Sequence, residues 1–261
     1  MRRRLDVELV RRGLAPSRTR AVELIEADHV TVSGAPARTA SRQVGAEEAI
    51  VVDAPPARFV SRGGEKLDGA LDAFGIDVTG RRALDAGAST GGFTDCLLQR
   101  GAAGVVAVDV GRGQLAWSLR TDQRVTVLER VNVRALEPAD VDGPVDLLVA
   151  DLSFISLVTV APALAILTTP DADLVLLVKP QFEAGRDRIG KGGIVRDPLV
   201  HRAVLGEVVD GLARSGLGVR GVVASPLKGA DGNVEFLVHV GHGAPTVASA
   251  ALDAVVEAVH A

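Results

Sequence analysis

Two patterns of hydrophobic and polar positions follow one another along this chain, and the change between them falls near residue 55. The first is typical of short amphipathic helices and then of strands in which apolar and polar residues alternate. The expected helices cover residues 5–13 and 18–28, and the expected strands cover 29–37 and 49–53. Gly13 is placed to end the first helix, and Ser17 to cap the second. The pattern predicts a small α+β unit.

The second pattern consists of near-continuous apolar runs of strand length, separated by stretches of helical spacing. The runs cover residues 82–87, 104–110, 124–130, 145–151, 174–179, 217–225 and 234–240, and the helical stretches cover 92–101, 113–121, 153–168 and 198–214. Such strands, separated by helices, are typical of a doubly wound and mostly parallel sheet. We therefore predict an α/β, Rossmann-like fold.

The last two expected strands are joined by the short segment "PLKGADGN", residues 226–233. A parallel crossover needs a dozen or more residues, so these strands must pair as an antiparallel hairpin. A seven-stranded sheet whose last strand is antiparallel is typical of S-adenosylmethionine-dependent methyltransferases. A plain dinucleotide-binding fold would not need it.

A proline-bearing connector, "DAPPAR" at residues 53–58, separates the two patterns. We expect a small domain at residues 1–55, a linker at 56–64 and a large domain at 65–261.

Composition narrows the class of protein. Hydrophobic residues make up 47% of the 261 positions, enough for a sizeable core. The single cysteine, Cys96, excludes an intramolecular disulfide and a cysteine-based zinc cluster. The amino terminus has no apolar stretch of the signal-peptide kind, and no apolar run approaches the roughly 18 residues of a membrane span. We expect a soluble, cytoplasmic protein with no membrane partner.

Charge is distributed unevenly. Residues 1–62 hold 11 Arg, no Lys and 8 acidic residues, a balance of +3, whereas the remainder has a balance of −7. A positive excess in residues 1–62 of an otherwise acidic chain favours an anionic partner for that part. An excess of three charges is also ordinary. The candidate RNA phosphate contacts are Arg4, Arg18, Arg20, Arg58 and Arg62.

The segment "LDAGASTGGF", residues 84–93, follows the first strand of the large unit and opens a helix. Its glycines permit a sharp turn and a close approach of the backbone to a ligand. Their spacing, G-x-x-x-G-G, differs from that of pyrophosphate-binding turns, and a carboxylate inside the turn would repel a pyrophosphate.

Acidic residues at the ends of the first two strands fit S-adenosylmethionine better. Asp85 is placed to hold the amino group of its methionine part, directly or through water. Asp109, 22 residues after Gly87, is placed to accept both ribose hydroxyls, and Asn132 is placed to face the adenine. The candidate cofactor-binding residues are Asp85, Gly87, Ala88, Ser89, Gly91, Gly92, Phe93, Asp109, Val110, Asn132 and Asp151.

A second glycine-rich segment, "GRDRIGKGG" at residues 185–193, matches the spacing G-x-x-x-x-G-K of ATP-binding loops. Gly192 stands where such loops need the Ser or Thr that ligates magnesium, so we reject an ATPase function. We interpret the segment as a flexible loop that could cover a site.

Four charged residues fall near the strand ends that should meet at one crevice. Asp151 ends the fourth strand, Lys179 ends the apolar run "LVLLV", Glu235 lies in the last strand, and Lys66 lies in a helix before the first. A structural network of ion pairs would have the same composition, so this pattern alone leaves the choice open.

The sequence resembles the FtsJ-type ribose 2′-O-methyltransferases and, more closely, the TlyA (haemolysin A-like) family of rRNA methyltransferases. The segments "SRGGEKL", "LDAGASTGGFTDCLLQRGA", "DLSFISL", "LVKPQFE", "GKGGIVRD" and "SPLKGADGNVEF" carry the resemblance. It implies that Lys66, Asp151, Lys179 and Glu235 form the catalytic K-D-K-E tetrad. It also implies ribosomal subunits as partner, with cytidine in 16S rRNA as the target and 23S rRNA left open.

The front of the chain resembles an S4 RNA-binding domain in "SRTRAVELIEADHVTVSG". Asp28 and Ser33 depart from the pattern, since S4 domains usually have Gly and Asn there. Such a domain should bind structured RNA by shape and phosphates.

The tetrad suits the implied chemistry. A ribose hydroxyl must lose its proton as the methyl group arrives, which a general base assists. A lysine can do so only where burial or a second cation lowers its pKa, whereas nearby carboxylates favour its charged form. We expect Asp151 and Glu235 to position the lysine and the hydroxyl, with no metal required.

Two other functions stay open from the sequence. They are a membrane-active haemolysin and a ribosome-binding protein whose catalytic site has decayed. Phe93, Phe154 and Phe182 adjoin the site motifs and could stack on a base, but we expect them in the core. We expect a monomer, with an oligomer left open.

Overall fold

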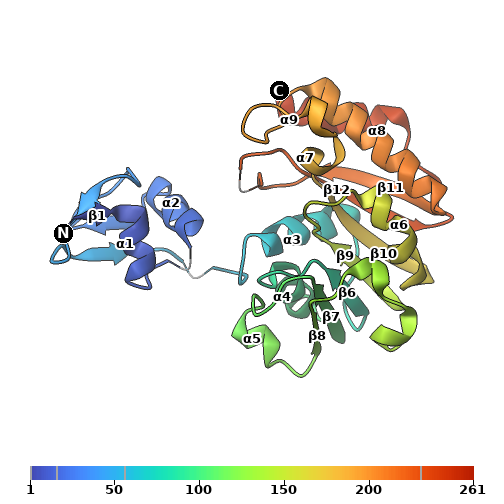
Figure 1. Ribbon diagram of the computed structural model, residues 1–261, viewed down its shortest axis with the longest axis horizontal. Coiled ribbons are helices and arrows are strands. Elements are labelled where there is room, and N and C mark those ends of the chain that lie inside the picture. Colours follow the sequence, from blue (N-terminus) through green and yellow to red (C-terminus); the bar gives the residue numbers. More distant parts are fainter. Residues whose placement is uncertain (1, 16, 56, 230) are drawn as a thin grey trace. The chain divides into compact units, whose positions relative to one another are not determined.

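The chain folds into two compact units, which divide between Ala57 and Arg58 (Figure 1). The computed structural model describes residues 2–15, 17–55, 57–229 and 231–261. Pro56 of the predicted connector and Ala230 of the predicted hairpin segment lie outside the described residues. Each unit has a hydrophobic core of its own.

The small unit packs two helices against short antiparallel strands. Its elements are β1 (Arg3–Arg4), α1 (Leu5–Arg11), α2 (Arg18–Glu26), β2 (Val30–Val32), β3 (Ala35–Pro36), β4 (Gln43–Val44) and β5 (Ile50–Val52). β2 lies between β3 and β5. Ser17 caps α2 as expected, accepting a hydrogen bond from the Arg20 amide at 3.2 Å. The predicted helices and the strands of the β3-β2-β5 sheet are confirmed, while the β1–β4 pair lies outside the predicted elements.

Asp28 and Ser33 both adopt the left-handed backbone conformation, with φ of 58° and 51°. Ser33 and Gly34, whose φ is 81°, form the turn between β2 and β3. A two-residue hairpin turn with two positive φ angles is the one that Asn-Gly adopts most readily. The two departures from the S4 pattern therefore fall where Gly or Asn would fit with less strain.

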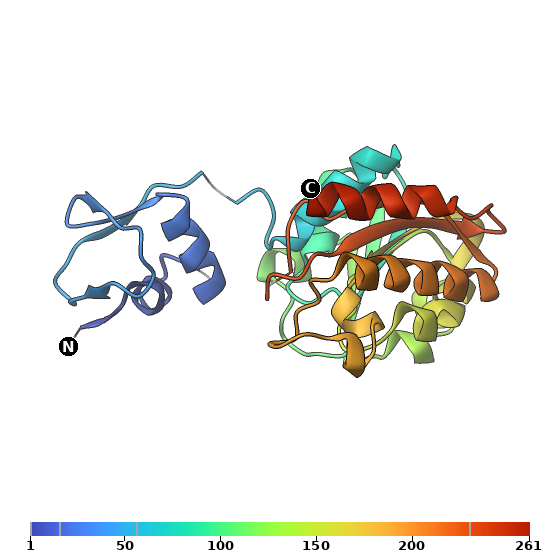
Figure 2. The same cartoon turned by 90° about the horizontal axis from the view of Figure 1, so that it is seen from above.

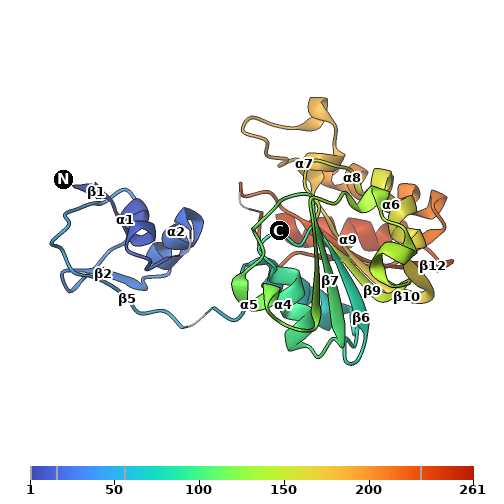
Figure 3. The same ribbon diagram turned by 60° about the horizontal axis from the view of Figure 1, so that its bottom comes forward.

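The large unit is built on one seven-stranded sheet. Its strands are β6 (Arg82–Ala86), β7 (Gly104–Asp109), β8 (Val125–Glu129), β9 (Val145–Ala150), β10 (Thr168–Val178), β11 (Leu217–Ala224) and β12 (Phe236–His242). They lie side by side in the order β11-β12-β10-β9-β6-β7-β8 (Figure 1), and Figure 3 shows the part of this order from β12 to β7. The last strand, β12, is antiparallel to both of its neighbours, and the other pairs are parallel. The predicted sheet with its antiparallel last strand is confirmed.

Helices cover both faces of the sheet. They are α3 (Gly63–Phe74), α4 (Gly92–Gln99), α5 (Trp117–Arg120), α6 (Leu157–Ile166), α7 (Pro180–Glu183), α8 (Pro198–Arg214) and α9 (Ser249–His260). Short 3-10 turns add η1 (Val133–Ala135), η2 (Pro138–Val141) and η3 (Arg186–Arg188). Because side chains alternate along a strand, Leu147 packs with α3, α4 and α5, while Leu148 packs with α6, α8 and α9.

The largest differences from the expected element boundaries are in α6, β10 and α5. α6 begins at Leu157 instead of residue 153, because Ser156 caps its first turn by accepting a hydrogen bond from the Val158 amide at 3.1 Å. β10 begins as early as Thr168, and α5 has a single turn. α9 lies outside the predicted elements, and it runs beside α8 (Figure 2), where Arg202 and Asp253 form an ion pair at 2.5 Å.

Candidate active site

The glycine-rich turn between β6 and α4 brings two strands close together. Gly87 has a φ of 87°, and a Cβ atom there would collide with the backbone oxygen of Asp151. The Asp151 amide in turn donates to the Ala86 carbonyl at 3.0 Å. Only glycine permits this approach. The turn therefore places Asp151 directly against the predicted cofactor-binding loop.

Asp85 is the next-to-last residue of β6 and is fully buried. One carboxylate oxygen accepts from the Thr94 hydroxyl at 2.7 Å, and the other has no hydrogen-bond partner among the described residues. Burial raises the pKa of the Asp85 carboxyl to about 7; the charges of Asp151 and Asp109 add to the rise, and Thr94 opposes it. A buried carboxyl oxygen without a partner fits a ligand that brings a cationic group, as the methionine part of S-adenosylmethionine does.

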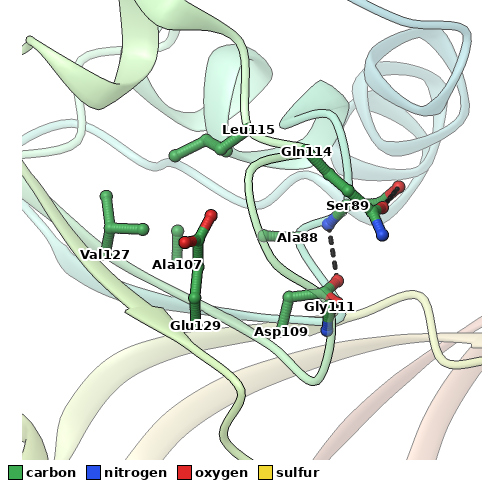
Figure 4. A pocket seen from close by; sticks show the side chains of 9 residues that line it. All are labelled: Ala88, Ser89, Ala107, Asp109, Gly111, Gln114, Leu115, Val127 and Glu129. Carbon is green, nitrogen blue, oxygen red and sulfur yellow. Dashed lines mark hydrogen bonds between the residues drawn. The ribbon is translucent and has the colours of Figure 1, made fainter.

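A pocket opens beside this turn, at the ends of β7 and β8 (Figure 4). It is lined by Ala88, Ser89, Ala107, Asp109, Gly111, Gln114, Leu115, Val127 and Glu129. The Asp109 carboxylate accepts from the Ser89 amide at 2.7 Å and from the Gly111 amide at 2.6 Å. These bonds fix the carboxylate at the pocket while leaving lone pairs for further donors. The predicted residues Ala88, Ser89 and Asp109 thus meet in one pocket.

Glu129 is a pocket residue outside the predicted set. It ends β8 and accepts from the Gly113 amide at 2.7 Å, and Arg120 forms an ion pair with it. The backbone bond from Gly113 lowers the pKa of its carboxyl, so it carries its charge at neutral pH. The sequence pattern could have revealed it, because Glu129 is an acidic residue at the end of the third strand of the large unit, as Asp109 is at the end of the second.

Five other predicted cofactor residues are not among those that line the pocket. Asn132 is exposed, and its side chain caps η1 by accepting from the Arg134 amide at 3.0 Å. Val110 is exposed, and Phe93 is buried in the core beside α3 and α4. Gly91 caps α4 with a φ of 98°, and Gly92 is the first residue of that helix.

The four tetrad candidates form two ion pairs. Lys179 Nζ lies 2.5 Å from Asp151 Oδ1, and Lys66 Nζ lies 2.5 Å from Glu235 Oε2. The first contact is an ion pair without the direction of a hydrogen bond, whereas Lys179 does donate to the Ser153 hydroxyl at 3.1 Å. Lys66 and Glu235 are buried, and the other pair is partly exposed.

All four residues reach the carboxyl edge of the parallel strands, by different routes. Asp151 and Lys179 directly follow the neighbouring strands β9 and β10. Glu235 directly precedes β12, and because that strand is antiparallel its beginning lies beside the end of β10, with Phe236 paired to Val178. The expectation that Glu235 lies within the last strand is therefore wrong by one residue.

Phe154 follows Asp151 by three residues and is 89% exposed. Its φ of 64° is a strained conformation for a bulky residue, and its ring centroid lies 5.0 Å from that of Phe182. The expectation that Phe154 belongs to the core is wrong. The Phe182 ring that it contacts also lies near Lys179, whose Nζ is 5.8 Å from the centroid of that ring.

Comparison with known proteins agrees with this geometry. A sequence model of the FtsJ-like methyltransferase family matches residues 59–242, and one of the S4 domain matches residues 3–50. The chain is 53% identical over 91% of its length to the 16S/23S rRNA (cytidine-2′-O)-methyltransferase TlyA of Mycobacterium tuberculosis, covering 89% of that protein. The chain belongs to the TlyA family of FtsJ-like methyltransferases.

Two further relatives of this TlyA-family chain carry the name hemolysin. Hemolysin A of Brachyspira hyodysenteriae is 38% identical over 90% of the chain and 98% of that protein. A hemolysin-named structure from Streptococcus thermophilus is 39% identical, with a TM-score of 0.81 over 99% of this chain and 96% of the other. Among the described residues, we find no helix with the length and apolar character that a membrane crossing demands.

The arginines proposed from the charge pattern as RNA contacts are held by neighbouring acceptors. In the small unit, Arg4 and Arg18 both pair with the buried Asp6, at 3.0 and 2.8 Å. The hydrogen bonds from Arg4 are the largest cause that lowers the pKa of the Asp6 carboxyl, to about 2. Arg20 pairs with Glu23 at 3.2 Å. The shared carboxylate fixes the direction of two guanidinium groups.

In the large unit, Arg58 forms an ion pair with Asp68, and its guanidinium lies 4.7 Å from the centroid of the Phe59 ring. Arg62 donates to the Lys228 carbonyl at 3.0 Å. Phe59 is buried against α3, so part of the predicted linker packs into the core of the large unit.

Proposed function

We propose that this protein is an S-adenosylmethionine-dependent methyltransferase that modifies the ribose 2′-hydroxyl of ribosomal RNA. The observation that carries the proposal is the pair of lysine–carboxylate contacts, Lys179–Asp151 and Lys66–Glu235, at the sheet edge where the glycine-rich turn of a methyltransferase lies. The 53% identical M. tuberculosis relative supports cytidine in 16S and 23S rRNA as the target. We infer that it acts in the cytoplasm, as a monomer.

The residues around the turn suit the methyl donor. Asp85 would receive the cationic methionine end, and Asp109 would accept from the ribose hydroxyls. Leu115 and Val127 give the pocket apolar walls for the adenine. When bound, the donor supplies a methyl group on a positively charged sulfur.

Lys179 is the residue we assign to the ribose hydroxyl. An amine has at most three positions for hydrogen bonds or ion pairs. Asp151 and Ser153 occupy two of them, so one direction remains for the 2′-oxygen. In its neutral form Lys179 would point its lone pair in this direction, take the hydroxyl proton as the methyl group arrives, and become an ammonium group that Asp151 stabilises. A hydroxyl held there also loses reorientation freedom before the reaction, which lowers the barrier. The buried Lys66–Glu235 pair lies at the same edge of the sheet, since Glu235 directly precedes β12 beside the end of β10.

Phe154 gives the target nucleotide a stacking surface. Its exposed ring, supported by Phe182, adjoins the loop that carries Asp151 and Ser153. Stacking of a base on an aromatic ring contributes on the order of 1–3 kcal/mol. The base of the reacting nucleotide can therefore rest there while its ribose meets Lys179.

Methyl transfer by two variants tests the proposal. The full chain is incubated with tritiated S-adenosylmethionine and unmodified ribosomal subunits, and the label is mapped. Wild type should label a ribose 2′-oxygen. Lys179→Ala should lose about 100-fold or more in rate, the range of general-base catalysis. Lys179→Arg keeps the positive charge near Asp151 but accepts no proton, so it should lose as much.

Three results would contradict the assignment. If wild type labels no ribose, the proposed function fails and the inactive ribosome-binding protein becomes the better interpretation. If Lys179→Arg is as active as wild type, Lys179 supplies only charge. Leakage of liposomes caused by the pure protein would favour the membrane-active alternative.

A further inference from the structure

Asn233 is a buried polar residue, 1% exposed, that belongs to neither ion pair nor to the cofactor pocket. Its side-chain oxygen accepts from the Val195 amide at 2.9 Å, and its side-chain nitrogen donates to the Gly193 carbonyl at 3.1 Å. Its own backbone oxygen accepts from the Gly229 amide at 2.9 Å. These partners lie in two loops that are far apart in sequence.

The first of these loops is the glycine-rich segment, residues 185–196. It leaves the core after Ala184 and returns at Val195, both of which are buried with Phe236. Its tip is closed by the bond from the Gly190 amide to the Ile194 carbonyl at 3.2 Å. Gly192 and Gly193 have positive φ, and a Cβ on either would meet no atom within 4 Å. Little therefore packs around the tip of the segment. The two hydrogen bonds of the Asn233 side chain are a main support for residues 193–195, where the segment returns to the core.

The second loop carries the catalytic carboxylate. Glu235 follows Asn233 by two residues, and its backbone oxygen accepts from the Ser225 amide at 2.9 Å. A Cβ on Gly229 would lie only 2.6 Å from Glu235 Oε1, so this loop wraps closely around the carboxylate. Asn233 therefore holds the backbone that sets the direction of the Glu235 side chain toward Lys66.

We propose that Asn233 is a positioning residue, which keeps the Lys66–Glu235 pair in its catalytic geometry by tying the glycine-rich segment to the loop before β12. The inference rests on the proposed function, because it assigns a catalytic role to the pair. The cofactor pocket lies at the ends of β7 and β8 and shares no residue with this network. Loss of the Asn233 side chain should therefore spare binding of the methyl donor.

The matched control is Thr168→Val. Thr168 is also a buried polar residue, and its hydroxyl lies 3.0 Å from the Ala165 carbonyl and 2.8 Å from His242 Nε2. It begins β10, whereas Lys179 follows the other end of that strand. Thr168→Val thus removes buried hydrogen bonds without touching the site, and it measures what lost stability alone does.

The experiment compares wild type, Asn233→Ala, Asn233→Asp and Thr168→Val as full-length chains. Three properties are measured: acetylation of Lys66 by mass spectrometry, trypsin cleavage after Lys191 and Arg196, and the kcat, KM and donor affinity of methyl transfer. Loss of two buried hydrogen bonds should raise Lys66 acetylation and cleavage of the segment about tenfold or more in Asn233→Ala. The kcat should fall by a similar factor, with donor affinity within about twofold of wild type.

Asn233→Asp retains the acceptor for Val195 but loses the donor to Gly193, so its values should be intermediate. Thr168→Val should match wild type in Lys66 acetylation and kcat even where its thermal stability falls. The proposal is overturned if Asn233→Ala leaves Lys66 as protected as Thr168→Val does. If wild type transfers no methyl group, the proposed function fails, and the acetylation and cleavage results still decide whether Asn233 holds the pair.

Discussion

At the scale of single residues, Asp85 shows how burial prepares a ligand site. The Asp85 carboxyl is buried away from water, and the negative charges of Asp151 and Asp109 oppose its ionisation. Thr94 supplies one hydrogen bond, and Lys179 is already paired with Asp151. Its pKa of about 7 follows chiefly from desolvation. A cationic group of a bound ligand would stabilise the ionised form of Asp85 and so lower the pKa of its carboxyl.

Binding of S-adenosylmethionine should therefore depend on pH through Asp85. The raised pKa means that the carboxyl is mostly neutral below pH 7 and mostly ionised above it. If the ionised carboxylate binds the cationic donor, affinity should rise about fivefold between pH 6 and pH 7 and decline above about pH 8, where the donor's α-amino group loses its proton. Titration calorimetry of wild type across this range measures it.

Asp85→Asn is the control for this prediction. The α-amino group of the ligand itself titrates at about 7.7–8.0, so some change with pH is expected in any variant. Asp85→Asn should bind weakly and should lack the rise between pH 6 and pH 7. A variant whose affinity follows pH as wild type does would show that Asp85 is not the titrating group.

The positions of single residues could be predicted from the sequence where a charged residue stood at the end of an expected strand. Asp85, Asp109, Asp151 and Lys179 were each predictable because a parallel sheet gathers its carboxyl ends at one edge. Glu129 also ends a parallel strand at this edge and lines the pocket. It was not predicted, because the adenine contact was assigned to Asn132, three residues later. The exposure of Phe154 was not predictable, since a strained loop and not hydropathy sets it.

At the scale of elements, the antiparallel strand β12 is what completes the tetrad. A parallel strand in its place would begin at the opposite edge of the sheet and take Glu235 away from Lys66. The short connection before it made this arrangement predictable. α9 was harder, because an amphipathic helix at a chain end has no strand after it to reveal a crossover. The two-residue strands β1 and β4 are too short for any alternation to show.

The hairpin turn at Ser33 offers a test of local strain. Asn tolerates the left-handed conformation better than Ser does, and Asn-Gly is the preferred pair for this turn. Ser33→Asn should therefore stabilise the β2–β3 hairpin by about 0.5–1 kcal/mol. Hydrogen exchange of the Ala37 amide, which donates to the Val30 carbonyl at 2.9 Å, reports the opening free energy of the hairpin.

Ser41→Asn provides the comparison, because Ser41 lies in the same unit and does not have a positive φ. It should leave the exchange of Ala37 unchanged. A gain of equal size in both variants would mean that Asn acts through the unfolded chain and not through the turn.

At the scale of the whole molecule, charge is divided between two units with separate cores. The small unit carries much of the arginine, and its carboxylates partly neutralise it, with Asp6 shared by Arg4 and Arg18. The large unit carries the pocket lined by Asp109 and Glu129, which we propose binds the methyl donor. We therefore propose that the small unit binds RNA and that the large unit transfers the methyl group. The S4 model matches the first part of the chain and the FtsJ-like model the second.

RNA binding should accordingly lose most of its salt dependence when the small unit is removed. Each phosphate contact contributes about 0.7–0.9 to the slope of log affinity against log salt, so loss of the contacts from Arg4, Arg18 and Arg20 should reduce the slope by about 2–3. The measurement is a salt titration of rRNA-fragment binding by the full chain and by a variant without residues 1–55. Circular dichroism and donor binding must first show that the shortened chain is folded. The full-length Arg20→Gln variant, which loses one contact, should lower the slope by about 0.7–0.9. If neither the shortened chain nor Arg20→Gln changes the slope, the phosphate contacts lie on the large unit instead.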